Sequence, residues 1–254
     1  MPASEGHLAR RRLDGKHVVV TGAAGGIGSE VCRRVRRLGG TLTAIDVPDR
    51  ADSPLWEELE APFIGIDLAG GLDEAHAALA PIESLDGLVN VAAVGPKEVF
   101  PEYTDSAWDL IFDVNLRAPM HMTQALFPRF QPGTAIVNFL SLEGLSVVNT
   151  SGKTAAAYAA SKGALATFTR TLAVDLGRAG HRVNAVAPGL IATAQTAAIS
   201  DASRQWVIGQ TPLGRVGEPI DVAKVVGFLL SSASRFMTGE EITIDGGFGM
   251  WLGR

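Results

Sequence analysis

The sequence is poor in the residues that build disulfides and metal–thiolate sites. Its 254 residues include one cysteine, Cys32, which can neither form an internal disulfide nor supply a cysteine-based zinc site alone. A reducing compartment, the cytoplasm, is therefore the expected location. The five histidines are scattered without ligand spacing, so we expect no metal site.

Long apolar runs and an excess of basic charge are also lacking. No apolar run approaches the roughly 20 residues that a membrane-spanning helix needs. The net charge of -5 leaves no general basic surface for nucleic acid, and the Arg10-Arg11-Arg12 triplet indicates a solvated tail over residues 1–13. We therefore expect a small-molecule ligand and neither a membrane nor a nucleic acid as partner.

Apolar residues are abundant, and their arrangement indicates the fold class. They make up 46% of the chain against 19% charged residues, which excludes disorder for most of it. Short apolar runs alternate with helical stretches, which favours an α/β fold: one Rossmann-type, doubly wound parallel sheet of about seven strands with helices on both faces. The expected strands are 17–21, 41–46, 62–68, 85–93, 135–141, 182–187 and 241–245, and the expected helices are 27–38, 71–80, 104–130, 154–179 and 219–232.

No repeat or linker divides the chain, so we expect a single domain over residues 14–254. The stretch 190–211 is rich in small residues and only weakly periodic. A connection of that length is usually functional, and we expect it to bind substrate.

A cluster of glycines joins the first expected strand to the first expected helix. Gly22, Gly26 and Gly28, with Ile27, would let backbone N–H groups approach a pyrophosphate at a helix N-terminus. With 29 glycines in the chain, this spacing alone arises easily by chance. Its position directly after an apolar strand and before an amphipathic helix is what predicts nucleotide binding.

Asp46 ends the second expected strand and indicates which nucleotide is bound. A carboxylate at this point accepts hydrogen bonds from both ribose hydroxyls and repels a 2′-phosphate. We therefore expect NAD as the cofactor, with NADP less favoured. Arg50 nearby is the residue that weighs against this preference.

Tyrosine and lysine are scarce, which makes one pairing of the two informative. The chain has two tyrosines, Tyr103 and Tyr158, and five lysines. Tyr158 and Lys162 lie four residues apart in an expected helix, so both project from one helix face and the ammonium can approach the phenol. The alternative is an ordinary amphipathic surface pair.

Taken together, these motifs resemble the short-chain dehydrogenase/reductase family over essentially all of residues 14–254. The resemblance implies a homotetramer built on the 154–179 helix and the C-terminal segment. It implies catalytic roles for Ser141, Tyr158, Lys162 and Asn115, the last helping to hold a proton-relay water. It implies cofactor contacts from Gly22, Gly26, Ile27, Gly28, Asp46, Asp67, Leu68, Asn90, Tyr158, Lys162, Pro188, Gly189, Ile191 and Thr193.

The resemblance also implies a reaction. Tyr158 would exchange a proton with the substrate oxygen while C4 of the nicotinamide exchanges a hydride with the adjacent carbon. Bringing a phenol from a pKa near 10 to about 7 needs roughly 4 kcal/mol, which we expect from Lys162 and the charge of NAD⁺. Ser141 would orient the substrate oxygen.

The sequence departs from the family pattern at three points. Ala93 stands where the family usually has glycine, which adds a methyl group beside the cofactor path. The stretch between Ser141 and Tyr158 is longer than usual, which leaves Ser146 as a competitor for the serine role. Glu143 could add a carboxylate near the substrate mouth.

We therefore expect an NAD(H)-dependent oxidoreductase that interconverts a secondary alcohol and a ketone. The residues of 142–157 and 190–211 suggest a moderately apolar, uncharged substrate such as a cyclic or aryl alcohol. One alternative is an NADP(H)-dependent carbonyl reductase of lipid or polyketide metabolism. Another is a dinucleotide-binding protein without turnover, against which Ser141, Tyr158 and Lys162 argue.

Overall fold

A parallel sheet forms the centre of the computed structural model, which describes residues 12–95, 100–146 and 155–250. In the described part of the chain, seven strands pair in the order β3-β2-β1-β4-β5-β6-β7, and every pairing is parallel. The strands are β1 (His17–Thr21), β2 (Thr41–Asp46), β3 (Phe63–Gly65), β4 (Leu85–Asn90), β5 (Phe130–Phe139), β6 (Arg182–Pro188) and β7 (Glu241–Ile244). The expected α/β, doubly wound fold is confirmed.

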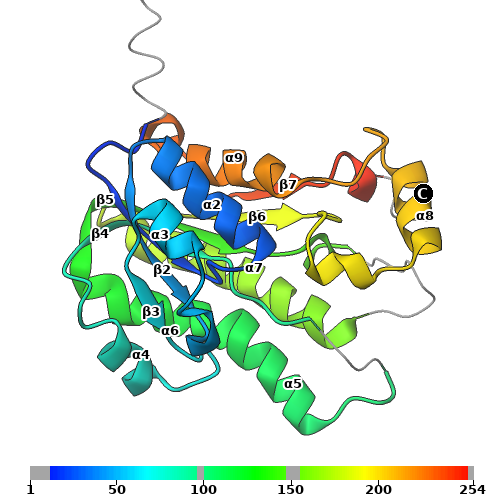
Figure 1. Ribbon diagram of the computed structural model, residues 1–254, viewed down its shortest axis with the longest axis horizontal. Coiled ribbons are helices and arrows are strands. Elements are labelled where there is room, and N and C mark those ends of the chain that lie inside the picture. Colours follow the sequence, from blue (N-terminus) through cyan, green and yellow to red (C-terminus); the bar gives the residue numbers. More distant parts are fainter. Residues whose placement is uncertain (1–11, 96–99, 147–154, 251–254) are drawn as a thin grey trace, which may run out of the picture.

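The helices cover both faces of this sheet (Figure 1). One face packs against α2, α3 and α9, and the other against α4, α6 and α7, each through its own apolar cluster. The helices are α2 (Gly26–Arg37), α3 (Leu55–Leu59), α4 (Leu72–Ala78), α5 (Asp105–Phe112), α6 (Ala118–Leu126), α7 (Ala156–Gly177), α8 (Asp201–Gln210) and α9 (Pro219–Leu230).

Burial on both faces explains why the central strands are apolar at nearly every position. Val18, Val19 and Val20 of β1 are at most 1% exposed, and Ile136 and Val137 of β5 are fully buried. Strand order reverses between β1 and β4, which are neighbours in the sheet. The carboxyl ends of the strands at such a switch point are where doubly wound folds bind ligands.

The single helix expected over 104–130 is wrong. A five-residue π-helical turn (Asp113–Arg117) separates α5 from α6, and a 3-10 turn (Phe127–Arg129) follows α6. β5 then begins at Phe130, whose backbone pairs with Leu85 of β4. Apolar residues at helical spacing continue across these breaks, so periodicity alone could not show them.

Two other expectations need correction at their edges. β3 is shorter than expected, and the short helix α3 before it was not foreseen. Most of the tail expected over 1–13 lies outside the described residues. Its last residue, Leu13, is 2% exposed and packs in the core, so the packed part of the chain includes it. No helix among the described residues has the length and apolar character to cross a membrane.

Candidate active site

A cavity of about 770 Å³ lies at the carboxyl ends of the strands. It brings together residues from nearly the whole length of the chain. Its walls contain fourteen of the predicted site residues: Gly22, Gly26, Ile27, Gly28, Asp46, Asp67, Leu68, Ser141, Tyr158, Lys162, Pro188, Gly189, Ile191 and Thr193. Asn90 and Asn115 do not line it.

The glycine loop between β1 and α2 forms a cradle that side chains would fill. Gly22 has a φ of +62°, and a Cβ there would lie 2.8 Å from the Ala92 backbone. A Cβ on Gly28 would lie 2.0 Å from the Gly22 carbonyl oxygen. The first turn of α2 contains no acidic residue, so its free N–H groups and helix dipole favour a bound anion.

Asp46 ties the end of β2 to this loop. Its carboxylate accepts hydrogen bonds from the Ala24 N–H at 2.8 Å and from the Val47 N–H at 2.9 Å. These bonds fix the carboxylate and leave lone pairs for ribose hydroxyls. Arg50 and Asp67 line the same cavity. The cradle and the carboxylate together fit the diphosphate and ribose of a nicotinamide dinucleotide.

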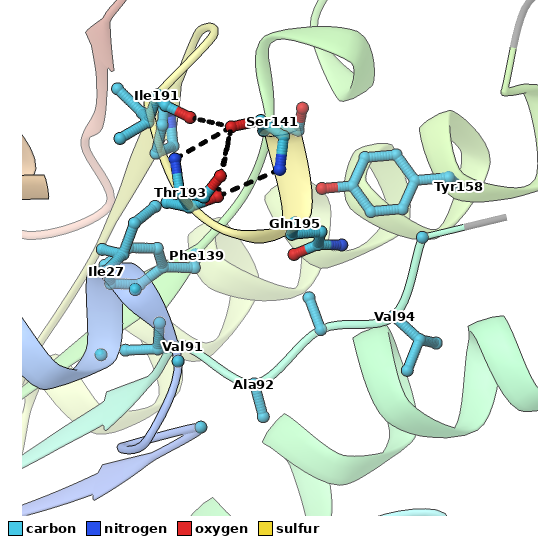
Figure 2. A pocket seen from close by; sticks show the side chains of 18 of the residues that line it. Ile27, Val91, Ala92, Val94, Phe139, Ser141, Tyr158, Ile191, Thr193 and Gln195 are labelled. Atoms are coloured by element: carbon cyan, nitrogen blue, oxygen red, sulfur yellow. Dashed lines mark hydrogen bonds between the residues drawn. The ribbon is translucent and has the colours of Figure 1, made fainter. Parts of the chain in front are cut away.

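The segment after β6 closes over the loop. A Cβ on Gly26 would lie 2.9 Å from the Thr193 side chain, so the two backbones approach closely. The Thr193 N–H donates to the Thr196 hydroxyl at 2.9 Å, and that hydroxyl donates to the Ile191 carbonyl at 2.6 Å (Figure 2). These bonds hold the predicted cofactor-binding residues of this segment in one short turn.

Ser141, Tyr158 and Lys162 converge at the other end of the cavity. The Tyr158 hydroxyl points into the cavity (Figure 2), and the Ser141 hydroxyl acts to lower its pKa. Lys162 is 1% exposed, its Nζ donates to the Phe139 carbonyl at 2.8 Å, and it lies 5.7 Å from the centre of the Tyr158 ring. Ser146 does not line the cavity, so the geometry favours Ser141 for the serine role.

Burial dominates the protonation of this pair. Desolvation raises the pKa of Tyr158 to about 12, although the hydrogen bond with Ser141 acts to lower it. Desolvation also lowers the pKa of Lys162 to about 7. Both shifts favour the neutral forms. The phenolate therefore needs positive charge beyond what the buried lysine supplies, and a bound nicotinamide cation is the expected source.

Asn115 is buried beneath the cavity. It sits in the π-helical turn, where its side chain accepts from the Val94 N–H at 2.9 Å and donates to the Val94 carbonyl at 3.0 Å and the Ser161 hydroxyl at 3.1 Å. Its side chain thus joins the loop after β4 to the catalytic helix α7. Its role in holding a relay water stays a prediction.

The Asn90 side chain is buried and does not line the cavity, and its expected cofactor contact stays a prediction. It is 3% exposed and donates to the Asn138 side chain at 2.8 Å, which in turn donates to Thr169 at 3.0 Å. The amides therefore link β4, β5 and α7 behind the cavity wall. The loop that follows Asn90, with Val91, Ala92 and Ala93, forms the wall itself.

The residues that sequence reasoning did not assign lie at the substrate end. Leu142, Val207 and Phe248 form a small apolar cluster beside the cavity and also line it. Phe248 follows β7, and Val207 is in α8, within the expected substrate segment 190–211. In the sequence, the only indications of their role are that Leu142 and Phe248 come after expected strands and that Val207 lies in the segment 190–211. Part of the 142–157 loop, residues 147–154, lies outside the described residues.

Comparison with known proteins agrees with this geometry. The family profile described as enoyl-(acyl carrier protein) reductase matches residues 22–249. The chain belongs to the short-chain dehydrogenase/reductase family, and it is an oxidoreductase of that family. No cluster of histidine, cysteine or acidic residues suited to a metal occurs among the described residues.

Three similar proteins illustrate the range within the family. Cyclopentanol dehydrogenase from Comamonas sp. is 36% identical over 252 residues, covering 93% of this chain and 98% of that protein. Galactitol 2-dehydrogenase (L-tagatose-forming) from Cereibacter sphaeroides is 35% identical, covering 94% and 97%. A gluconate 5-dehydrogenase from Burkholderia cenocepacia, solved with NADP and tartrate, has a TM-score of 0.88 at 27% identity, covering 96% and 99%.

Proposed function

We propose that this chain is an NAD(H)-dependent enzyme that interconverts a secondary alcohol and a ketone. The observation that carries the proposal is the convergence of Ser141, Tyr158 and Lys162 in one cavity with the glycine cradle and Asp46. A nicotinamide dinucleotide, when bound, supplies the hydride acceptor or donor. The remaining steps belong to the side chains of this chain.

Tyr158 is proposed as the acid and base. In the oxidation direction the phenolate takes the proton of the substrate hydroxyl, and in reduction the phenol returns a proton to the substrate oxygen. Ser141 lines the cavity with Tyr158 and is proposed to orient the substrate oxygen. Lys162 lies beside the phenol and stabilises the phenolate whenever its own amino group is protonated.

Cofactor preference is part of the proposal. Asp46 supports NAD(H), because its carboxylate is held at the end of β2 and would repel a 2′-phosphate. An NADP(H)-dependent reductase of lipid metabolism is the second candidate. Arg50 in the cavity wall and the description of the matching family profile favour it, as does the NADP found in the gluconate 5-dehydrogenase structure.

The substrate is proposed to be uncharged and moderately apolar. Leu142, Leu190, Ile199 and Phe248 are among the apolar side chains that line the cavity. The 36% identity to a cyclopentanol dehydrogenase supports a cyclic alcohol. The similarity to a galactitol dehydrogenase supports a hydroxylated one.

A homotetramer is also proposed for the chain. Val174 on α7 is 73% exposed, and Phe236 before β7 is fully exposed. Burial of these side chains against a neighbouring subunit would be favourable. Light scattering of the purified protein tests this, and a monomeric mass contradicts it.

Nicotinamide absorbance tests the activity. The protein is incubated with NAD⁺ or NADP⁺ and a panel of secondary alcohols, and in the reverse direction with NADH or NADPH and the corresponding ketones. We expect reduction of NAD⁺ with at least one cyclic alcohol. Turnover that persists undiminished in Tyr158→Phe contradicts the proposed chemistry.

A further inference from the structure

Glu143 places a carboxyl group in the wall of the substrate end. It follows Ser141 by two residues in the turn Leu142–Gly144 and lines the cavity. The side chain is half-buried, and its carboxylate has neither a hydrogen bond nor an ion pair with any residue in the described ranges. Its carboxylate oxygens are not among the fully buried atoms without a partner, so a substrate that displaces water from this part of the cavity has to supply a polar group in its place.

The fold holds Glu143 in place on three sides. Its backbone N–H donates to the Ser141 hydroxyl at 3.2 Å. Leu142 is 5% exposed and packs in the cluster with Val207 and Phe248. Gly144 lies directly against α7, because a Cβ there would be 2.7 Å from the Cβ of Lys162. The turn that contains Glu143 therefore packs closely against the catalytic helix α7.

The electrostatics show that Glu143 and the reacting group share one environment. The charge of Glu143 contributes to the raised pKa of Tyr158, which requires the carboxylate to lie near the phenol. The other charged residue lining this end is Lys162, and its ammonium is already bonded to the Phe139 carbonyl. Among the described residues, no protein cation is therefore in place to satisfy Glu143.

We propose that Glu143 binds a second hydroxyl group of the substrate, so that this enzyme prefers diols or polyols whose second hydroxyl lies near the reacting carbinol. The inference rests on the proposed function, because it takes Tyr158 and Ser141 as the groups that bind the first oxygen. Ser141 and Glu143 then bind two substrate oxygens from one turn. The apolar cluster of Leu142, Val207 and Phe248 contacts the carbon skeleton of the substrate.

A hydroxyl fits this carboxyl better than an ammonium group does. Burial raises the pKa of Glu143 and so favours its neutral form. A carboxyl that is neutral or ionised can pair with a hydroxyl, which both donates and accepts, whereas an ammonium needs the ionised form. An anionic group on the substrate at this position is disfavoured by the same carboxylate.

The test compares cyclohexanol with cyclohexane-1,2-diol in the wild-type protein and in Glu143→Leu and Glu143→Gln. The measured quantity is the ratio of kcat/KM for the diol to that for cyclohexanol. We expect Glu143→Leu to lower this ratio about 10-fold, because the second hydroxyl loses its partner. Glu143→Gln, whose amide still accepts and donates, should retain most of it. Glu102→Leu removes the same charge at an exposed position and should leave the ratio unchanged.

The outcomes separate this inference from the proposed function. An unchanged ratio in Glu143→Leu overturns the inference while leaving alcohol oxidation intact. Absence of turnover with either alcohol and either cofactor contradicts the proposed function instead. In that event the role of Glu143 in binding is tested by thermal denaturation. The Tm of the wild-type protein, Glu143→Leu and Glu102→Leu is measured in the presence of NADH, with and without cyclohexane-1,2-diol. A shift lost in Glu143→Leu but kept in Glu102→Leu supports it, and an equal shift in all three proteins overturns it.

Discussion

The two ends of the cavity differ in how much of their lining is backbone and how much is side chain. The end proposed to bind adenosine is formed largely by the glycine loop and the N-terminus of α2, with the Asp46 carboxylate held there by two N–H groups. The reacting end is formed by side chains of α7, of α8 and of the segments that follow β5 and β7. Backbone geometry binds the common part of a cofactor, whereas side chains can change to suit a substrate. The two ends should therefore respond differently to mutation.

The largest effect is expected at the reacting end, from Tyr158→Phe. Removing the hydroxyl removes the proton donor and acceptor, which typically contributes 10²- to 10⁴-fold to turnover, so kcat should fall by about that factor. Cofactor affinity, measured by titrating NADH fluorescence, should change little. Tyr103→Phe is the matched control, since among the described residues the Tyr103 hydroxyl accepts a hydrogen bond from the Ala157 N–H at 3.2 Å. An equal loss of kcat in Tyr158→Phe and Tyr103→Phe would contradict a specific catalytic role for the Tyr158 hydroxyl.

Gly28→Ala should produce the opposite pattern at the adenosine end. The new Cβ would meet the Gly22 carbonyl oxygen at 2.0 Å, and neither atom can move without a shift of the backbone. We expect a loss of roughly 1–3 kcal/mol in the free energy of unfolding, together with weaker NADH binding. Chemical denaturation and fluorescence titration measure the two effects.

Gly177→Ala provides the control for that variant. Gly177 ends α7 with nothing within 4 Å of a Cβ. Alanine there should leave stability unchanged or raise it by about 0.4–1 kcal/mol. Tight NADH binding by Gly28→Ala would show that the loop is not the diphosphate cradle.

Asp46→Ala tests cofactor choice at the same end. Hydrogen bonds to charged groups contribute about 1.5–3 kcal/mol, so the ratio of NAD⁺ affinity to NADP⁺ affinity should fall about 10- to 100-fold. Isothermal titration with each cofactor measures this ratio. Asp49→Ala, which removes an exposed neighbouring carboxylate, should leave it unchanged. Equal losses for both cofactors in Asp46→Ala would mean that Asp46 does not contact the ribose.

The smallest effect is a shift in pH dependence from Glu143→Gln. The charge of Glu143 helps to raise the pKa of Tyr158, so removing that charge lowers this pKa. Alcohol oxidation needs the phenolate, and its rising limb should therefore move to lower pH, by less than about one unit. A pH profile of kcat measures the shift, and Glu102→Gln should show none. A shift to higher pH would place Glu143 away from the phenol.

The contrast between the two ends also explains what sequence reasoning could reach. Gly22, Gly28 and Asp46 follow strands that periodicity locates well, and their spacing along the chain maps onto one edge of the sheet. Tyr158 and Lys162 are one helical turn apart, so local geometry alone places them together. The direction of the Asn90 side chain was not predicted, because a strand pattern does not show which face a polar residue takes when both faces are buried.

Sequence by itself determined the fold class, the glycine loop and the tyrosine–lysine pair, because each depends on local spacing and on the period of apolar residues. Only the tertiary structure decided the division between α5 and α6, the link from Asn115 to Val94 and Ser161, and the place of Glu143 in the cavity wall. The turn at 142–144 meets Val207 and Phe248 through packing between segments far apart in the chain. Such contacts depend on three-dimensional shape, and no local pattern of residues encodes them.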